Sequence, residues 1–559
     1  MSLSRLYDEY WDYILREFPV LATYLGDHRF DDRLDNFSAA GFERHAEQFR
    51  TFKHKLKSFA KPTRTRDRLN YELFEKELTL HINSALFKPY LLPITHLSGP
   101  HVDLPRLTSF HPFNSRQDLQ NYLTRLHQLP VVFNEIIECM RIGIKERITL
   151  PMVIIEKIVP QIETQIVKES TKSGFFVPTV RSIRGISKQE ISFFEDDLSD
   201  VILGPVNSSY SRLLSFMKSD YHSASRKEIG LWAVPRGKEW YQHNIESYTS
   251  TSLTPKSIHR IGLHELAKIQ KAVRLVIVDL GFRGTLHQFS EFVRRDRSQY
   301  FKTGDEILSL FKKILSRVEP KLPSFFGTIP TAGYQLREVE AFRSQTAPAA
   351  FYSRPPEDGS RPGCLYVNTF KPDSRPKYMM EALAYHEVLP GHHLQVSLQQ
   401  ESASLPRFRR HGGYSAFEEG WALYAEELGK EMGFYEDLLS EFGRLMAEAR
   451  RAARLVVDTG IHTMRWTRGA SIRFLKHNLS ANEQETISEI DRFIAWPGQA
   501  LGYKIGQLRI QDLRSRAQTT LGARFDLRLF HDKLLSQGAL PLDMLEKFIL
   551  EWIAKRMRR

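Results

Sequence analysis

Apolar residues recur at spacings of three and four along most of this 559-residue chain. This period matches the turn of an α-helix and differs from the strict alternation of a half-buried β-strand. It predicts helices at residues 1–18, 68–87, 118–142, 255–277 and 305–318. Because Thr254 supplies a capping hydroxyl and Pro255 suits the first helical position, a helix start is expected there. We therefore expect a mainly α-helical protein.

The exception to the helical period lies between Gly333 and Asn368. Residues 349–352 and 364–368 are short runs typical of strands, and the connection 353–363 is rich in proline, glycine and serine. The pattern predicts a long hairpin or small β-sheet just before the segment that carries most of the chemistry.

The length of the chain exceeds what one small core requires. No fixed repeat and no low-complexity tract divides it. We predict one continuous module over residues 1–559, which could consist of a helical lobe at 1–250 and a second lobe at 251–559 that holds the candidate site.

The composition limits the classes of partner and location. Lys and Arg outnumber Asp and Glu by 79 to 66, a net charge of +13, but they are scattered and accompany no nucleic-acid-binding motif. We expect no nucleic-acid partner, and an acidic substrate is the milder interpretation of the charge. The two cysteines, Cys139 and Cys364, fit a reducing compartment. Charged residues interrupt the apolar positions of residues 1–18, and the most apolar stretch elsewhere, 272–282, contains Arg274 and Asp279. We therefore predict no signal peptide, no membrane span and a cytoplasmic protein, and its oligomeric state stays open.

The densest chemistry lies in the segment His386-Glu387-Val-Leu-Pro390-Gly391-His392. A His-Glu pair on a helix is the first half of a zinc-hydrolase motif, in which two histidines bind the metal and the glutamate is the general base. On a regular helix His392 would lie ~240° around and ~9 Å along from His386, too far to share one ion. Pro390 and Gly391 can break the helix and turn His392 back toward His386, and geometry alone leaves His393 as the alternative.

A second His-Glu pair, His264-Glu265, lies in a strongly helical segment with no metal-like residues after it. We interpret it as ordinary helix surface.

Several stretches together resemble the family catalogued as domain of unknown function 885. They are His386 to Gln395, Phe18 to His28, Asp358 to Gly363, Glu419 to Tyr424, Arg454 to His462, and Pro497 to Tyr503. Members of that family are regarded as similar to the helical gluzincin metallopeptidases, such as thimet oligopeptidase, angiotensin-converting enzyme and the Taq-type carboxypeptidases. The resemblance implies a large multi-helix fold with a deep cleft, and zinc as the cofactor.

The resemblance also implies a third ligand from a glutamate on a later helix. Glu419 fits that place, because residues 415–432 form a helix on which Glu419 and Glu426 share the side opposite Phe417. Glu418 stays open as an alternative ligand. His386, His392 and Glu419 would then hold zinc, while Glu387 takes a proton from the water that attacks a peptide carbonyl.

Further groups are expected to contact the substrate. Tyr503 and His462 resemble the oxyanion-stabilising pair of the helical gluzincins, although a lone tyrosine or histidine is often a core residue. Arg454, with Arg509 as a second candidate, could hold a substrate carboxylate. The strand that contains Tyr352, or its partner at 364–368, could pair with an extended peptide backbone.

The function that these residues predict is zinc-dependent hydrolysis of peptide bonds. Two alternatives stay open: a zinc hydrolase of a non-peptide amide or ester, and a binding protein with a vestigial site.

Overall fold

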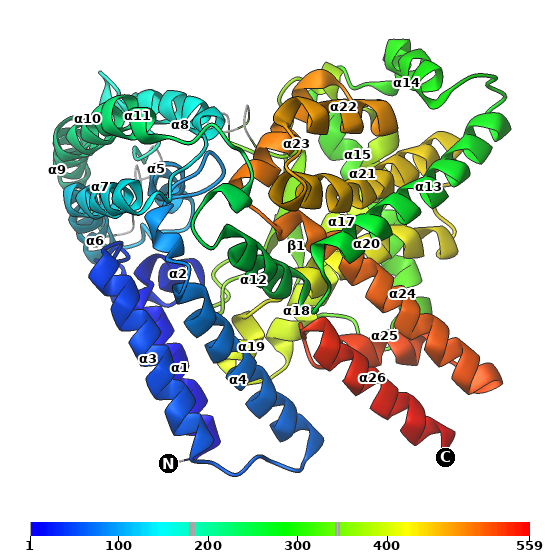
Figure 1. Ribbon diagram of the computed structural model, residues 1–559. Helices are drawn as coiled ribbons and strands as arrows, with labels where there is room; N and C mark the ends of the chain where they lie inside the picture. The colour runs from blue at the N-terminus through cyan, green and yellow to red at the C-terminus, as the bar shows by residue number, and fades with distance from the viewer. Residues whose placement is uncertain (1, 178–182, 184, 341–343, 345–346, 559) are drawn as a thin grey trace. The chain divides into compact units, whose positions relative to one another are not determined.

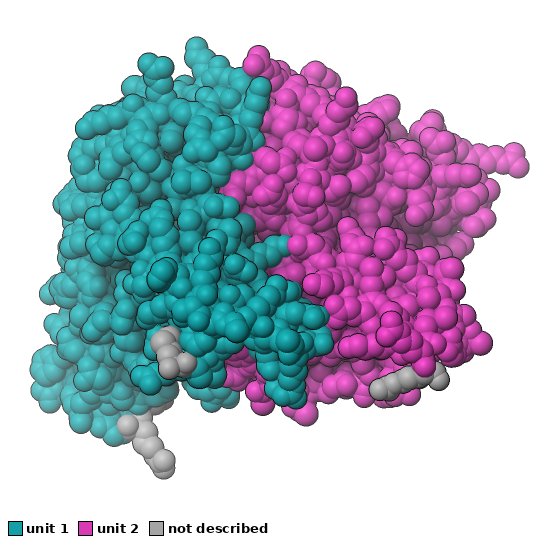
Figure 2. All heavy atoms as spheres, turned by 60° about the horizontal axis from the view of Figure 1, so that its bottom comes forward, with its two compact units in different colours: residues 1–240, 356–360 teal, residues 241–355, 361–559 magenta. Residues whose placement is uncertain are grey.

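The computed structural model describes residues 2–177, 183, 185–340, 344 and 347–558. Figure 2 shows the chain's two compact units. Unit 1 comprises Met1–Trp240 and Pro356–Ser360, and unit 2 comprises Tyr241–Pro355 and Arg361–Arg559. The chain therefore leaves unit 2 for five residues and then returns to it.

Unit 1 is built mainly of α-helices (Figure 1). They are α1 (Leu3–Glu17), α2 (Pro19–Tyr24), α3 (Ala39–Lys57), α4 (Thr65–Ala85), α5 (Pro100–Asp103), α6 (Arg116–His127), α7 (Leu129–Glu146), α8 (Met152–Gln165), α9 (Lys188–Val201), α10 (Asn207–Phe216) and α11 (His222–Ala224).

Aromatic side chains hold the first helices of unit 1 together. The ring of Tyr10 on α1 lies 4.9 Å from that of Phe74 on α4 and 5.5 Å from that of Phe52 on α3, both at steep angles. Edge-to-face contacts of this kind add to the free energy gained by burying the rings. The apolar stripe of residues 1–18 thus faces the core, as the period predicts.

One helix prediction is wrong. The expected helix at 118–142 is two helices, because α6 ends at His127 and α7 begins at Leu129. Pro130, the second residue of α7, has no N–H and suits a first helical turn but not a helix interior. The predictions for α1, α4, α13 and α15 are confirmed, and Thr254 caps α13 by accepting a hydrogen bond from the Ser257 N–H.

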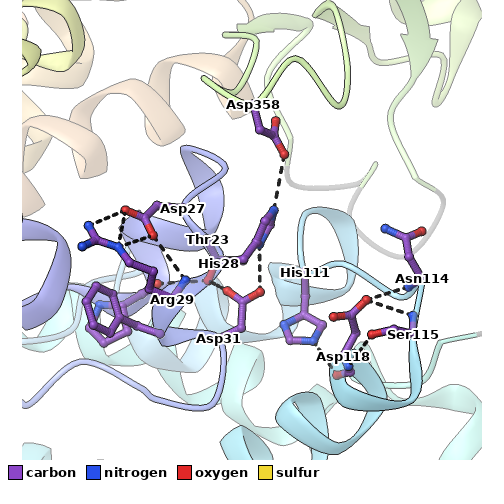
Figure 3. A network of polar contacts seen from close by, with 12 residues as sticks. Thr23, Asp27, His28, Arg29, Asp31, His111, Asn114, Ser115, Asp118 and Asp358 are labelled. Atoms are coloured by element: carbon purple, nitrogen blue, oxygen red, sulfur yellow. Dashed lines mark hydrogen bonds and ion pairs between the residues drawn. The ribbon is translucent and has the colours of Figure 1, made fainter.

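Residues 356–360, the short excursion of the chain into unit 1, contact residues 25–28 of that unit. His28 lies between two carboxylates, with Nδ1 at 2.8 Å from Asp31 and Nε2 at 3.4 Å from Asp358 (Figure 3). The Glu357 N–H donates to the Leu25 carbonyl at 2.8 Å. A side chain at position 26 would collide with Asp358, and the backbone of Gly26 has a φ of +86°. Two separate sequence motifs therefore meet here.

Unit 2 holds the remaining helices and a three-stranded sheet. The helices are α12 (Gly237–Thr249), whose residues 237–240 belong to unit 1, α13 (Pro255–Asp279), α14 (Leu286–Arg295), α15 (Gly304–Val318), α16 (Leu322–Phe325), α17 (Met380–Glu387), α18 (His392–Glu401), α19 (Arg407–His411), α20 (Ser415–Glu431), α21 (Leu438–Thr463), α22 (Arg468–Leu479), α23 (Glu483–Ala495), α24 (Gly502–Leu521), α25 (Leu527–Leu535) and α26 (Leu542–Met557).

The sheet confirms the predicted hairpin and adds a strand. β2 (Ala350–Ser353) pairs antiparallel with β3 (Gly363–Val367), and β1 (Tyr334–Glu338), which the sequence did not predict, pairs parallel with β3. The order β1-β3-β2 makes β3 central. Both edges of β3 are therefore occupied, so the suggestion that residues 364–368 could pair with a substrate is wrong.

The long helix α21 is the centre of unit 2, and α13 runs beside it (Figure 1). A side chain at Gly262 of α13 would meet Leu455 and Val456 of α21 at 2.7 and 2.8 Å, so glycine permits the close packing. Glu265 on α13 is buried and forms an ion pair with Lys504 at 3.2 Å. The interpretation of His264-Glu265 as helix surface is therefore wrong for the glutamate.

Among the residues that the structure describes, no helix combines the length and hydrophobicity needed to cross a bilayer.

Candidate metal centre

The helix that carries His386 and Glu387 stops at a sharp turn. α17 ends at Glu387, and α18 begins at His392. A Cβ at Gly391 would lie 1.9 Å from the His386 carbonyl oxygen and 2.2 Å from that of Tyr385, so only glycine lets the chain fold back against the last turn of α17. Trp421 of α20 donates from its indole nitrogen to the Pro390 carbonyl at 2.9 Å and fixes the turn. The helix break thus turns His392 back as the sequence predicts.

This turn brings three potential ligands together. Nε2 of His386 lies 3.4 Å, and Nε2 of His392 3.5 Å, from Oε2 of Glu419 on α20. Within the described part of the chain, His386, His392 and Glu419 are the one set of His, Cys, Asp and Glu side chains whose ligand atoms all lie within 4.8 Å of one another. Burial would raise the pKa of Glu419, but the two imidazoles outweigh it and hold that pKa well below its usual range.

Glu426 supports His386 from behind. Its Oε1 accepts a hydrogen bond from His386 Nδ1 at 2.8 Å, which leaves Nε2 directed at Glu419. Burial alone would lower the pKa of His386, but Glu419 and Glu426 raise it to about 9. The sequence placed Glu426 on the same face of its helix as Glu419, but no contact with His386 was predicted. Its position two helical turns after Glu419 could have indicated that it lies close to the site.

Glu387 is fixed by the sheet. Its Oε2 accepts a hydrogen bond from the Tyr352 backbone N–H at 3.0 Å. Burial raises the pKa of Glu387, while the neighbouring His386 and His392 lower it. β2 is an edge strand, so the outer edge that faces α17 is partly used to orient this carboxylate. The hydroxyl of Tyr352, a predicted substrate contact, lies 2.9 Å from His393 Nδ1.

Tyr503 lies beside the three ligands. Its ring stacks on that of His386 at 6.4 Å and an interplanar angle of 13°. Burial and the nearby Glu419 raise its pKa. Its hydroxyl accepts a hydrogen bond from Arg492 at 3.2 Å, and the Arg454 guanidinium lies 4.7 Å from its ring centre. Because Arg492 uses the acceptor side of the oxygen, the phenolic proton is left to donate elsewhere. Sequence reasoning missed Arg492.

A buried aspartate holds the turn that leads to Tyr503. The Gly498 N–H donates to both oxygens of Asp458 at 3.1 and 3.2 Å, and Tyr241 donates its hydroxyl to the same carboxylate. Gly498 has a φ of +88°, a conformation that favours glycine. Burial raises the pKa of Asp458 to about 7.

The structure places the other candidates apart from the three ligands. His393 turns toward Tyr352 and Ser397, and burial lowers its pKa to about 4. Glu418 lies 4.0 Å from Arg354. His462 is fully buried, with Nε2 at 2.9 Å from the Phe493 carbonyl and its ring against Tyr241, which are the contacts of a core histidine. Arg509 binds Glu546 on α26.

Two solved structures share this architecture. The chain matches a crystal structure described as "the putative lipoprotein from Colwellia psychrerythraea" with 27% identity and a TM-score of 0.94 over 99% of each chain. It also matches a structure from Shewanella oneidensis, described as "a putative lipoprotein of unknown function", with 19% identity and a TM-score of 0.73 over 98% of this chain and 100% of that one. The second likeness shows the fold alone.

No curated protein matches the sequence. The profile of the family described as bacterial protein of unknown function (DUF885) matches residues 19–549, nearly the whole chain. The protein therefore belongs to the DUF885 family.

Proposed function

We propose that this protein is a zinc-dependent hydrolase of peptide bonds, with a fold similar to the helical gluzincins and a substrate cleft beside α17. One observation carries the proposal: the Nε2 atoms of His386 and His392 converge on one oxygen of Glu419, and Glu387 follows His386 directly in the chain.

The residues present fit a zinc ion. Ligand atoms of a tetrahedral site with bonds of ~2.0–2.1 Å lie roughly 3.3 Å apart, close to the 3.4 and 3.5 Å measured from Glu419 Oε2 to the two Nε2 atoms. These separations are long for hydrogen bonds, and Oε2 is buried without a hydrogen-bond partner among the described residues. A buried carboxylate oxygen left so between two imidazoles is what a cation would satisfy. The Glu426–His386 contact is the outer support that metal-binding histidines usually have.

Zinc in this place would supply a Lewis acid and lower the pKa of water at the site. The chain's own residues would then move the proton. Glu387 Oε2 is held by the Tyr352 N–H, while its Oε1 has no hydrogen bond within the described residues and can take the proton of the attacking water. As the C–N bond breaks, Glu387 would return that proton to the amine nitrogen.

Tyr503 would stabilise the negative charge that develops on the carbonyl oxygen. Its hydroxyl lies in a buried site next to Glu419 and already accepts a hydrogen bond from Arg492. A donor fixed in advance loses little free energy in reorganisation during the reaction.

The cytoplasmic location expected from the composition stays a prediction. Two similar structures are described as those of lipoproteins, so cell fractionation would test this prediction.

The test combines metal analysis with mutation. We expect one zinc per chain, lost in His392→Gln and Glu419→Gln but retained in the matched controls His393→Gln and Glu418→Gln, which replace adjacent residues of the same type. Glu387→Gln should keep zinc and lose about a hundred- to ten-thousand-fold in turnover.

A peptide-library digest read by mass spectrometry provides the turnover measurement and separates endo- from exopeptidase cleavage. Full activity in Glu387→Gln, or zinc retained in His392→Gln and lost in His393→Gln, would show the proposal to be wrong. Turnover of esters or non-peptide amides, with no peptide in the library cleaved, would point to the alternative hydrolase.

A further inference from the structure

A cavity of about 320 Å³ lies in unit 2 on the face of α17 that carries His386 and Glu387. Ala382 and Leu383 line it, and they precede His386 and Glu387 by one helical turn, so all four side chains share one face of the helix. Ala349, just before β2, and Glu426, the support of His386, also line the cavity. The cavity therefore adjoins the candidate site.

The walls of this cavity are strongly basic. Two lining residues are acidic, Glu426 and Glu485, whereas five are arginines: Arg294, Arg375, Arg450, Arg451 and Arg454. Arg454 is buried and the other four are half-buried. We refer to this space as the arginine cavity.

Three of the five arginines, Arg450, Arg451 and Arg454, form ion pairs with glutamates, which leaves the charges of the other two uncompensated within the described residues. Arg294 and Arg375 donate to the carbonyls of Ser480 and Phe370, at 3.0 and 3.4 Å, and within the described residues neither forms an ion pair. Arg450 reaches Glu485 only at 3.5 Å.

The two arginines nearest the candidate site also keep donors available. Arg451 donates to Glu426 at 3.2 Å, but its Nε is buried without a partner among the described residues. Arg454 binds Glu489 through Nε at 2.6 Å, and its two terminal amino groups have no hydrogen bond in the described part of the chain. Buried donors of this kind are normally satisfied, so the arrangement calls for an acceptor inside the cavity.

We propose that the arginine cavity binds a carboxylate of a short peptide substrate. Guanidinium groups match carboxylates in a two-point geometry, and several in one enclosed space favour an anion over a neutral group. The volume lies at the small end of ligand pockets, roughly 300–1,000 Å³, which suits one or two amino-acid residues. This inference rests on the proposed function, and it makes the protein an exopeptidase that acts near a carboxyl terminus, or a peptidase that selects an acidic side chain.

Peptide binding to full-length protein carrying Glu387→Gln tests this inference without consuming the peptide. Calorimetry would compare acetyl-Ala-Ala as the free acid with the same dipeptide as its amide, which differ in one negative charge. We expect the free acid to bind about ten- to a hundred-fold more tightly. Acetyl-Ala-Glu amide locates the source of the carboxylate: binding as tight as that of the free acid assigns recognition to a side chain, and binding as weak as that of acetyl-Ala-Ala amide assigns it to the carboxyl terminus.

Arginine variants locate the binding site. Arg294→Gln and Arg375→Gln should each weaken binding of the free acid about ten-fold and leave binding of the amide unchanged, with melting temperatures close to that of the parent. The control Arg516→Gln removes an arginine that binds Asp512 and Glu546 outside the cavity, and it should change neither affinity. Equal binding of acid and amide, no measurable binding of either, or equal losses for both peptides in the cavity variants would overturn the inference.

These outcomes can be told apart from failure of the proposed function. Selective binding of the free acid by a protein that holds no metal would keep the arginine cavity and refute the zinc hydrolase. Bound zinc and peptide turnover, with no preference for the free acid over the amide, would support the zinc hydrolase and refute carboxylate binding in the arginine cavity.

Discussion

At the scale of single residues, three side chains of the candidate site each have a partner that orients them. Glu426 orients His386, the Tyr352 N–H orients Glu387, and Arg492 orients Tyr503. These supports come from three different elements, α20, β2 and α23. His386, Glu387 and Tyr503 thus each form a pair with a residue that lies farther from the proposed metal position.

The role of Tyr503 can be tested by removing only its hydroxyl. Tyr503→Phe should lower kcat about a hundred- to a thousand-fold, or roughly 2.7–4 kcal/mol, with little change in KM, because the hydrogen bond would form only in the transition state. Steady-state kinetics and thermal unfolding on one preparation provide the measurement.

A second buried tyrosine serves as the control. The hydroxyl of Tyr424 interacts with His531 and Arg514, away from the three ligands. Tyr424→Phe should lose roughly 0.5–1.5 kcal/mol of stability and keep kcat. If kcat is unchanged in Tyr503→Phe as well, Tyr503 has no catalytic role.

The sequence predicted the grouping of His386 with His392 because its cause is local: Pro390 and Gly391 act on the residues next to them. It could not predict which neighbours those side chains would meet. The pairing of Glu426 with His386 depends on how α20 is rotated against α17, and the packing of His462 against Tyr241 depends on α12 and α21. Periodicity identifies the face of a helix but not the helix that packs on it.

At the scale of secondary structure elements, α21 carries a line of buried polar residues at helical spacing. Arg444, Glu448, Arg454, Asp458 and His462 bind in turn to Glu441, Lys504, Glu489, Gly498 and Phe493. Buried polar groups must be paired, so this line fixes the positions of α23, α24 and the turn between them. The helix thereby connects the arginine cavity to the turn before Tyr503.

The helices α20 and α24 touch at two glycines. A Cβ on Gly506 would lie 1.8 Å from the Ala416 carbonyl oxygen and 2.7 Å from the Gly420 Cα. Gly420 follows Glu419, and Gly506 lies one turn after Tyr503. Gly506→Ala should therefore separate the two helices and displace Glu419 from Tyr503. We expect a loss of roughly 1–3 kcal/mol in unfolding free energy and a lower zinc content.

Urea unfolding and metal analysis would check this prediction. Gly469→Ala is the matched control, because Gly469 is an exposed glycine of α22 whose added methyl would meet only the end of the Arg473 side chain, at 3.5 Å. That variant should be neutral or slightly stabilised, since alanine favours helix. Equal behaviour of the two variants would contradict the proposed need for close packing.

Several helices and the hairpin could be predicted, because their signals lie within about twenty residues of one another. β1 could not, since it pairs in parallel with a strand that begins 25 residues after β1 ends, at Gly363. The burial of Glu265 was equally hidden, because Lys504 lies on α24, far along the chain. Contacts between residues far apart in the chain determine both features, and a single sequence does not show which distant residues meet.

At the scale of the whole molecule, stability should depend on pH through buried histidines such as His531. His531 is fully buried between the Tyr424 hydroxyl and the Phe325 carbonyl, at 2.8 and 2.9 Å, and burial lowers its pKa from 6.5 to about 4. Between pH 6.5 and about 4, this histidine is protonated in the unfolded chain but stays neutral in the folded chain. The free energy of unfolding therefore decreases as pH falls through that range. The total decrease in unfolding free energy is about 3 kcal/mol, at about 1.4 kcal/mol for each unit by which the pKa is lowered.

Unfolding free energies at pH 7, 6 and 5 would measure this effect. His531→Gln should be less stable than the parent at pH 7, and the gap should narrow by about 2 kcal/mol at pH 5, because the variant has no histidine to protonate. Replacing the exposed His264 by glutamine should leave the profile of the parent unchanged. Parallel profiles for the parent and His531→Gln would rule out this source of acid sensitivity.

The excursion of residues 356–360 has a consequence for synthesis on the ribosome. Unit 1 is otherwise complete at Trp240, yet residues 356–360, whose Asp358 contacts His28, begin 116 residues later. At typical rates of ~5–20 residues per second, the delay is roughly 6–23 s. During that interval the nascent first unit presents Gly26 and His28 without their covering loop. Unit 1 therefore reaches its final state only after residues 241–355 of unit 2, which include β2, have been synthesised.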